Sequence, residues 1–194
     1  MIPAPPDQQP DPLAASIVDR VRATPARLGR TRLVAVDGPA GSGKTTLAAS
    51  LDSEGQARGL DIAVVHLDDM YAGWATDFDE LSTRVLSQLL TPLLHGTTAS
   101  WQRYDWDAGR FDGWEPVAPP DVLVLDGCGS GALALAAYTS LLVWVEAPPE
   151  VRIERGVARD GEQVLPHWLA WMDHEREHFA TNGTRERADV RLPT

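Results

Sequence analysis

Continuous apolar runs of strand length recur along the chain and alternate with segments of helical periodicity. Such runs are typical of parallel strands that are covered on both faces. They occupy Arg32–Asp37, Ile62–Leu67, Asp121–Asp126 and Leu141–Val145, and a fifth strand is expected at Ala188–Leu192. Apolar residues three and four apart predict helices at Leu13–Ala23, Lys44–Arg58, Leu81–Leu93, Glu150–Val157 and Gln163–Phe179. This alternation predicts an α/β fold of three layers, built on a mainly parallel, five-stranded sheet.

Two segments fall outside this alternation. Residues 1–12 contain five prolines among polar residues, which predicts a flexible tail before a single domain at residues 13–194. Residues 97–120 are rich in tryptophan, aspartate and glycine, so a hairpin or a long functional loop is expected there instead of a helix.

The first apolar strand leads directly into the sequence Gly38-Pro39-Ala40-Gly41-Ser42-Gly43-Lys44-Thr45-Thr46. Its G-x-x-x-x-G-K-T pattern, placed between a strand and a helix, is that of a P-loop. The glycines let successive backbone N–H groups point at phosphate oxygens, and the start of the following helix adds further donors. In such a loop Lys44 contacts the β- and γ-phosphates, and the Thr45 hydroxyl binds Mg²⁺. The motif predicts a P-loop NTPase fold that binds a nucleoside triphosphate, taken to be ATP, with Mg²⁺.

Acidic residues follow three of the predicted strands, at Asp37, Asp68-Asp69 and Asp126. Because ligands of an open parallel sheet bind at the carboxyl ends of its strands, we expect these acids to share one cleft with the triphosphate. Phosphoryl transfer to an alcohol needs a carboxylate that accepts the hydroxyl proton. We assign Asp68 as this base and Asp126 as a direct or water-mediated metal ligand. The alternative for Asp68 and Asp69 is a turn or helix-capping role.

Three arginines, Arg152, Arg155 and Arg159, share one face of a predicted helix. Guanidinium groups that face the phosphates would offset the charge that develops during transfer, and the segment could close as a short lid. The alternative is a solvated helix face on which the arginines pair with Glu150 and Glu154.

These motifs together resemble the uridine kinase branch of the P-loop kinases, which includes phosphoribulokinase-like and pantothenate kinase-like enzymes. The resemblance extends over about residues 32–192, and short motifs besides the P-loop carry it. They are Asp68-Asp69-Met70-Tyr71, Tyr104-Asp105-Trp106, Asp126-Gly127, and Arg155 with Arg159-Asp160. The corresponding family patterns are Asp-x-Phe-Tyr, Tyr-Asp-Phe and Glu-Gly, so the chain has Met70 where the family has phenylalanine.

The resemblance implies catalytic roles for matching residues. Asp68 would be the catalytic base, and Thr45, Asp68 and Asp126 would surround Mg²⁺. Arg155 and Arg159 would come from the lid and act in catalysis together with the P-loop lysine.

For the acceptor, the resemblance implies a pocket that contains Tyr71 and Tyr104. Trp106, beside Tyr104, is a further candidate for substrate contact, and so is Arg110. The segment Asp107-Ala108-Gly109-Arg110 lacks the histidine with which uridine kinases contact the base.

The resulting hypothesis is an ATP-dependent kinase that phosphorylates a hydroxyl of a small molecule, with a uridine- or cytidine-like nucleoside as the favoured acceptor. A nucleoside-monophosphate kinase is an alternative that would need a basic site such as Arg103 or Arg110. A pantothenate-like metabolite kinase is another. A non-catalytic, ATP-binding regulatory module is the alternative from a different class of protein.

Composition narrows the classes of partner. The chain has 194 residues and a formal net charge of −11, so its field repels nucleic acids and anionic membrane surfaces. Its most apolar window, residues 131–147, is shorter than a membrane span. The first residues lack the pattern of a secretory signal, and a single cysteine agrees with a reducing compartment, so a cytoplasmic location is expected. The sequence is compatible with a homo-oligomer.

Other motifs compete with this hypothesis. His174-Glu175-Arg176-Glu177-His178 matches the zinc motif H-E-x-x-H, but a third ligand would have to be Glu186 or Asp189. Asp126-Gly127-Cys128-Gly129 matches the D-x-x-G of GTPase switches, but no Asn-Lys-x-Asp segment accompanies it. Cys128 has no evident histidine partner and is expected to be a small buried residue, and Trp168 and Trp171 are expected to serve in packing.

Overall fold

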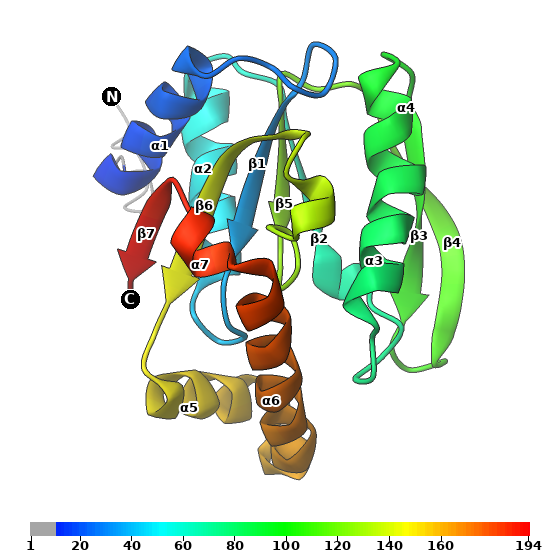
Figure 1. Ribbon diagram of the computed structural model, residues 1–194, viewed down its shortest axis with the longest axis vertical. Coiled ribbons are helices and arrows are strands. Elements are labelled where there is room, and N and C mark those ends of the chain that lie inside the picture. The colour runs from blue at the N-terminus through cyan, green and yellow to red at the C-terminus, as the bar shows by residue number, and fades with distance from the viewer. Residues whose placement is uncertain (1–10) are drawn as a thin grey trace, which may run out of the picture.

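The computed structural model describes residues 11–194, so that of the expected tail only Asp11 and Pro12 lie within the described residues. A sheet of five parallel strands forms its centre, in the order β2–β5–β1–β6–β7 (Figure 1). The strands are β1 (Arg32–Asp37), β2 (Ile62–His66), β5 (Val122–Asp126), β6 (Thr139–Glu146) and β7 (Val190–Pro193). The predicted α/β fold with a parallel five-stranded sheet is therefore confirmed.

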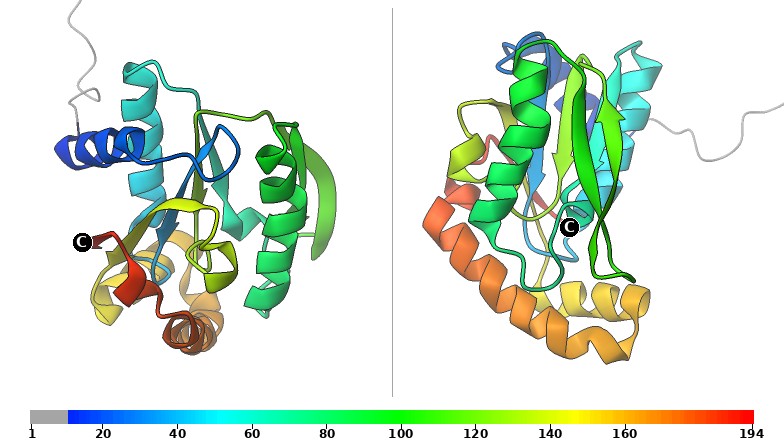
Figure 2. Two further views of the ribbon diagram at one scale, coloured as in Figure 1. Left: turned by 45° about the horizontal axis from the view of Figure 1, so that its top comes forward. Right: turned by 90° about the vertical axis from the view of Figure 1, so that its right-hand side faces the viewer.

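Helices cover both faces of this sheet (Figure 2). They are α1 (Pro12–Ala23), α2 (Lys44–Ala57), α3 (Phe78–Val85), α4 (Thr91–Leu94), α5 (Pro149–Asp160), α6 (Leu165–Asn182) and α7 (Thr184–Arg187). Successive strand residues point to opposite faces, so each face has its own apolar cluster. Helices α1 and α2 pack over Val34 and Val124, whereas α3, α4 and α6 pack over Leu33 and Leu123.

The helix boundaries follow from capping residues. The Asp11 carboxylate accepts hydrogen bonds from the N–H groups of Leu13 and Ala14, so α1 begins at Pro12, and the prediction that residues 11 and 12 belong to the tail is wrong. Asp77 caps α3 in the same way. The run from α3 to α4 is continuous through a π-helical turn at Leu86–Leu90, which confirms the long amphipathic helix predicted there.

The segment at residues 97–120 forms the hairpin that was one of its two predicted alternatives. Strands β3 (Ala99–Asp105) and β4 (Arg110–Val117) pair antiparallel, outside the main sheet. Ala99 and Trp101 point inward and join the core beneath α4, whereas Trp114 on β4 is 55% exposed. The hairpin tip points toward the end of the molecule at which α5 and α6 lie (Figure 1).

Short 3₁₀ turns complete the connections, at Leu67–Asp69, Leu133–Leu135 and Glu162–Val164. Helix α5 and the start of α6 lie beyond the carboxyl ends of the strands, and α6 then runs back along the sheet (Figure 1). None of the helices within residues 11–194 is long and apolar enough to span a bilayer.

Candidate active site

A cavity of about 1200 Å³ lies at the carboxyl ends of β1, β2 and β5. Its walls come from the P-loop and the start of α2, the segment after β2, the hairpin tip, α5, α6 and the end of β7. A pocket for one small ligand occupies roughly 300–1000 Å³, so this cavity can hold a nucleotide together with a second small molecule.

The shape of the P-loop depends on two glycines that pack against neighbouring backbone. Gly38 has a φ of +141°, and a Cβ there would lie 2.0 Å from the carbonyl oxygen of Val145 in β6. Gly41 has a φ of +77°, and its Cβ would lie 2.7 Å from the carbonyl oxygen of Arg152 in α5. The loop is therefore held between β6 and α5, and a side chain at either position would displace backbone.

The backbone N–H groups of this loop fall into two sets. Three are engaged by the protein, since those of Gly38, Ala40 and Ser42 donate to Asp37 Oδ1 (2.7 Å), Glu175 Oε2 (2.8 Å) and the Pro39 carbonyl oxygen (3.2 Å). The N–H groups of Gly41, Gly43 and Lys44 have no acceptor among residues 11–194. Because they lie at the N-terminus of α2, these three groups are available to phosphate oxygens.

Lys44 is the only lysine in the chain, and its side chain is buried in the cavity wall. Its Nζ donates to the Pro39 carbonyl oxygen at 3.0 Å and lies 3.7 Å from Cys128 Sγ. Burial acts to lower the pKa of Lys44, but the surrounding acidic groups, Asp68 and Asp126 among them, raise it overall. The ammonium form therefore persists in the cavity and can meet a phosphate.

Asp68 and Asp126 reach the cavity from the ends of the paired strands β2 and β5. Asp68 lies in the 3₁₀ turn after β2, and burial raises the pKa of its carboxyl group, which makes it a stronger base. Asp69, by contrast, faces Arg103 at 3.5 Å and is not part of the cavity wall.

Asp126 has one engaged and one free carboxylate oxygen. Its Oδ2 lies 2.8 Å from His66 Nδ1, and this hydrogen bond raises the pKa of the imidazole. Its Oδ1 is buried with no hydrogen-bond partner among the described residues. Sequence reasoning missed His66, because no motif marks it and only the sheet register places it beside Asp126.

The oxygen atoms in this part of the cavity fit Mg²⁺. The Thr45 side chain, Asp68 and Asp126 all line the cavity, and Asp126 Oδ1 still needs a partner. Mg²⁺ prefers oxygen ligands and is usually held by one or two carboxylates together with substrate phosphates. No group of three or more His, Cys, Asp or Glu side chains within residues 11–194 is arranged as a metal cage, so phosphate oxygens would have to complete the coordination.

Five aromatic side chains line the cavity and form what we call the aromatic chamber: Tyr71, Trp74, Trp106, Trp168 and Trp171. Trp74 meets Trp106 edge-on at 5.7 Å, and the Tyr71 ring lies 5.0 Å from that of Trp171. Trp106 Nε1 donates to the Asp68 carbonyl oxygen at 3.2 Å, so the hairpin tip lies beside the predicted base. Trp168 and Trp171 are buried, as packing residues would be, but they also face the cavity. Trp74 was missed, because it lies in an irregular segment without a motif.

Two predicted acceptor contacts lie outside the cavity wall. Tyr104 packs edge-on against Trp106 at 5.5 Å and supports it without facing the cavity. The Arg110 side chain is 72% exposed at the hairpin, where Asp112 lies 4.0 Å away. The structure brings Tyr71 and Trp106 together but leaves Arg110 in solvent.

The arginine row of α5 divides in the structure. Arg155 and Arg159 line the cavity, where Arg155 Nη1 donates to the Gly41 carbonyl oxygen at 3.3 Å and Arg159 pairs with Asp160 at 2.7 Å. The prediction that Arg152 faces the phosphates is wrong. Arg152 is buried and binds Glu175 Oε1 at 2.6 Å, because a carboxylate buried in α6 needs a cation beside it.

The prediction that Asp37 shares the cleft with the other acids is also wrong. Asp37 is fully buried and accepts N–H groups of Gly38 (2.7 Å), Gly129 (3.1 Å) and Gly131 (2.8 Å). Burial raises the pKa of its carboxyl group to about 6 in spite of these bonds. Asp37 thus joins the start of the P-loop to the segment after β5.

The H-E-x-x-H sequence has a packing role in α6. His174 and His178 lie against Phe78, with ring centroids 4.9 and 4.0 Å away. Glu175 is engaged by Arg152 and by the Ala40 N–H group. Asp189, one of the two candidate third ligands, accepts the N–H group of Leu142 at the sheet edge.

The stability of the protein should depend on the protonation of His178. Burial lowers the pKa of this imidazole to about 4, so the folded state favours its neutral form. The contribution of neutral His178 to the free energy of unfolding is complete above pH 6.5 and is lost as the pH falls from there toward 4. Asp37 acts in the opposite sense, because its raised pKa removes stability as the pH rises from 3.8 to 6. Each contribution is about 3 kcal/mol, so the two nearly cancel in the wild type.

We therefore expect the His178→Leu variant to gain stability relative to the wild type on acidification from pH 6.5 to 4.5. Urea unfolding at both pH values measures this difference in the free energy of unfolding. His95→Leu, at an exposed position, is the matched control and should follow the wild type. Parallel pH profiles of the wild type and His178→Leu would contradict the assignment.

Comparison with known proteins identifies the family to which the chain belongs. The family model of an AAA domain matches residues 34–178, which is most of the chain. Comparison with curated protein sequences gives no match.

Several solved structures share the fold. A possible uridine kinase from Bacillus stearothermophilus is 19% identical with a TM-score of 0.66, and the alignment covers 92% of this chain and 96% of that one. A putative fructose transport system kinase from Silicibacter sp. is 21% identical with a TM-score of 0.67, covering 93% and 98%. A D-glycerate 3-kinase from Cryptococcus neoformans is 17% identical with a TM-score of 0.57, covering 93% and 90%. The chain belongs to the AAA domain family of P-loop proteins, and its fold is that of P-loop kinases.

Proposed function

We propose that the protein is an ATP-dependent kinase that transfers the γ-phosphoryl group to a hydroxyl of a nucleoside. The observation that carries this proposal is the single cavity in which Lys44, Asp68 and Asp126 meet the aromatic chamber. A phosphate-binding loop, a carboxylate in the cavity wall and a stacking surface for a planar acceptor are the parts that this reaction needs.

Each residue has a definite task in this mechanism. The free N–H groups of the P-loop and the Lys44 ammonium bind the phosphates. Arg155 and Arg159 line the same cavity and stabilise the negative charge of the transferred phosphoryl group. The Asp68 carboxylate accepts the proton of the acceptor hydroxyl as the hydroxyl oxygen bonds to the γ-phosphorus. The bond between the γ-phosphorus and the β,γ-bridging oxygen breaks, and ADP leaves with that oxygen. Thr45, Asp68 and Asp126 would hold Mg²⁺ together with the phosphates, and the ion would neutralise phosphate charge when bound.

The aromatic chamber favours a nucleoside over the alternative acceptors. Tyr71, Trp74 and Trp106 offer faces and edges on which a planar base can stack. A nucleoside monophosphate would need a further cation, and the two candidates, Arg103 and Arg110, lie outside the cavity wall. The D-glycerate 3-kinase named above shares the fold, but glycerate has no aromatic ring that could stack in the chamber.

The acceptor is tested by the release of ADP from Mg·ATP in the presence of candidate acceptors. The panel comprises uridine, cytidine, deoxynucleosides, CMP, pantothenate, glycerate and fructose. We expect stimulation by one or more nucleosides. Stimulation by CMP or a non-nucleoside alone would discard the nucleoside and keep the kinase, whereas ATP binding without any stimulation would favour the non-catalytic module.

Replacing Trp106 by alanine should weaken acceptor binding and leave ATP binding unchanged. Loss of a stacking contact costs roughly 1–3 kcal/mol, so the KM of the acceptor should rise about five- to a hundredfold. Steady-state kinetics with the acceptor varied at saturating ATP measures this effect. Trp114→Ala is the matched control, because Trp114 belongs to the same hairpin but lies outside the cavity. Equal KM values for the two variants would remove Trp106 from the acceptor site.

A further inference from the structure

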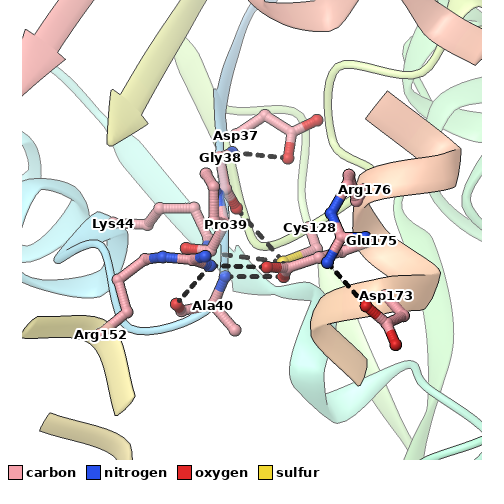
Figure 3. Close-up of polar contacts among 10 residues, drawn as sticks. All are labelled: Asp37, Gly38, Pro39, Ala40, Lys44, Cys128, Arg152, Asp173, Glu175 and Arg176. Atoms are coloured by element: carbon pink, nitrogen blue, oxygen red, sulfur yellow. Dashed lines mark hydrogen bonds and ion pairs between the residues drawn. The ribbon is translucent and has the colours of Figure 1, made fainter. Parts of the chain in front are cut away.

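A buried ion pair holds the P-loop from outside the cavity. Figure 3 shows the Glu175 carboxylate of α6 joined by hydrogen bonds to Arg152 of α5 and to Ala40 of the P-loop. Glu175 Oε1 accepts a hydrogen bond from Arg152 Nη1 at 2.6 Å, and Glu175 Oε2 accepts the Ala40 N–H group at 2.8 Å. Arg152 Nη1 also lies 3.4 Å from the Ala40 carbonyl oxygen. The N–H and the C=O of Ala40 are thus both bound by one pair of charged side chains.

This pair is poorly explained by stability alone. Glu175 is 2% exposed and Arg152 is 7% exposed, so both charges have lost most of their hydration. Such pairs are often no more stabilising than apolar side chains of similar volume. Arg152 Nε is, in addition, buried without a partner among the described residues, which a pair selected for stability would avoid.

The pair lies where α5 touches the P-loop at adjacent positions. The Gly41 backbone packs against the Arg152 backbone, and Arg155 Nη1 donates to the Gly41 carbonyl oxygen. The helix that brings Arg155 and Arg159 to the cavity therefore also braces the loop that precedes α2. Because Ala40 is bound on both sides, the next N–H group, that of Gly41, is directed by a fixed peptide.

We propose that Glu175 and Arg152 are positioning residues for the triphosphate. They hold the Ala40 peptide so that the free N–H groups from Gly41 onward are already oriented to bind phosphate oxygens. The inference deepens the proposed function and rests on it. It also changes one expectation, since the Ala40 N–H group binds Glu175 and is not itself a phosphate ligand.

The double variant Arg152→Met, Glu175→Met tests this role. It replaces the ion pair by apolar side chains of similar length, so the melting temperature should stay near that of the wild type. The dissociation constant for Mg·ATP, measured by titration calorimetry, should rise about tenfold or more because the loop is no longer preset. In turnover assays the KM for ATP should rise while the KM for the acceptor stays unchanged. Glu177→Met, on an exposed position of the same helix, should leave all of these values unchanged.

Amide hydrogen exchange in the wild type gives a second measurement that needs no variant. The Ala40 N–H group should be protected in the nucleotide-free protein and should change little on addition of Mg·ATP. The Gly41 and Gly43 N–H groups should gain protection at that step. An Ala40 amide that exchanges freely, or that gains protection together with Gly41, would overturn the proposal.

The outcomes separate this inference from the proposed function. If the wild type binds no ATP, both fall together. If the wild type binds ATP and the folded double variant binds it equally well, the positioning role alone is refuted. If the double variant does not fold, hydrogen exchange of the Ala40 amide in the wild type tests the positioning role instead.

Discussion

Asparagine in place of Asp68 should lower the turnover number by ~10²–10⁴-fold, because an amide cannot accept the hydroxyl proton. The side chain keeps its size, and the phosphates are held by the P-loop N–H groups and Lys44, so the affinity for Mg·ATP should stay close to that of the wild type. Asp68 is suited to the role because desolvation raises the pKa of its carboxyl group, although the neighbouring Lys44 ammonium acts to lower it. Steady-state kinetics and nucleotide titration on the same preparation separate the two effects.

Asp69→Asn is the matched control for this substitution. Asp69 is adjacent in the chain but faces Arg103 outside the cavity, so its loss should leave turnover near the wild-type value. The pH profile gives a further check, since the acidic limb of kcat/KM should lie above the pH typical of an ordinary aspartate and should vanish in Asp68→Asn. A fully active Asp68→Asn enzyme would refute the assignment of the base.

Lys44→Met should lower turnover by roughly 10²–10³-fold, as the loss of one preorganised charge at a transferring group does. Methionine has a similar length and removes a buried charge, so the protein should remain folded. The loss of the ammonium should also raise the pKa of Asp68 further, because the Lys44 charge is the main influence that lowers it. The acidic limb of the residual activity should therefore move to higher pH.

Lys44→Arg serves as the comparison for this second substitution. Arginine keeps the charge, but its planar guanidinium cannot take the place of a compact ammonium whose Nζ lies 3.0 Å from the Pro39 carbonyl oxygen. We expect only partial recovery of turnover, with the pH profile restored more fully than the rate. If Lys44→Met keeps wild-type turnover and ATP affinity, the P-loop is not the phosphate site.

Local patterns were enough to predict the fold and the convergence of the P-loop, Asp68 and Asp126 on one cavity. Continuous apolar runs identify buried parallel strands, and such strands bring their carboxyl ends to one edge. Lys44 and the two acids Asp68 and Asp126 therefore had to lie near one another once the strands were recognised. Asp37 differs because its carboxylate is drawn to three backbone N–H groups behind the P-loop, a preference that only the folded loop reveals.

Contacts between distant segments could not be predicted in this way. Helical spacing places Arg152 on a face of α5, but the identity of the neighbour on that face depends on how α6 packs. Glu175 is 23 positions further along the chain, inside a sequence that resembled a zinc motif. Trp74 lies in an irregular segment, where periodicity carries no signal, and its place at the cavity is set by contacts with Trp106, His167 and Trp171.

The solitary lysine also makes the proposed nucleotide site chemically addressable. An acyl phosphate linked to ATP would deliver its acyl group to Lys44, the single side-chain amine of the chain. One labelled peptide, apart from the amino terminus, would then report occupancy of the P-loop in a complex mixture, and unlabelled nucleotide would compete with the label. Because every other basic side chain is an arginine or a histidine, the intensity of that one peptide would directly compare the affinities of competing nucleotides.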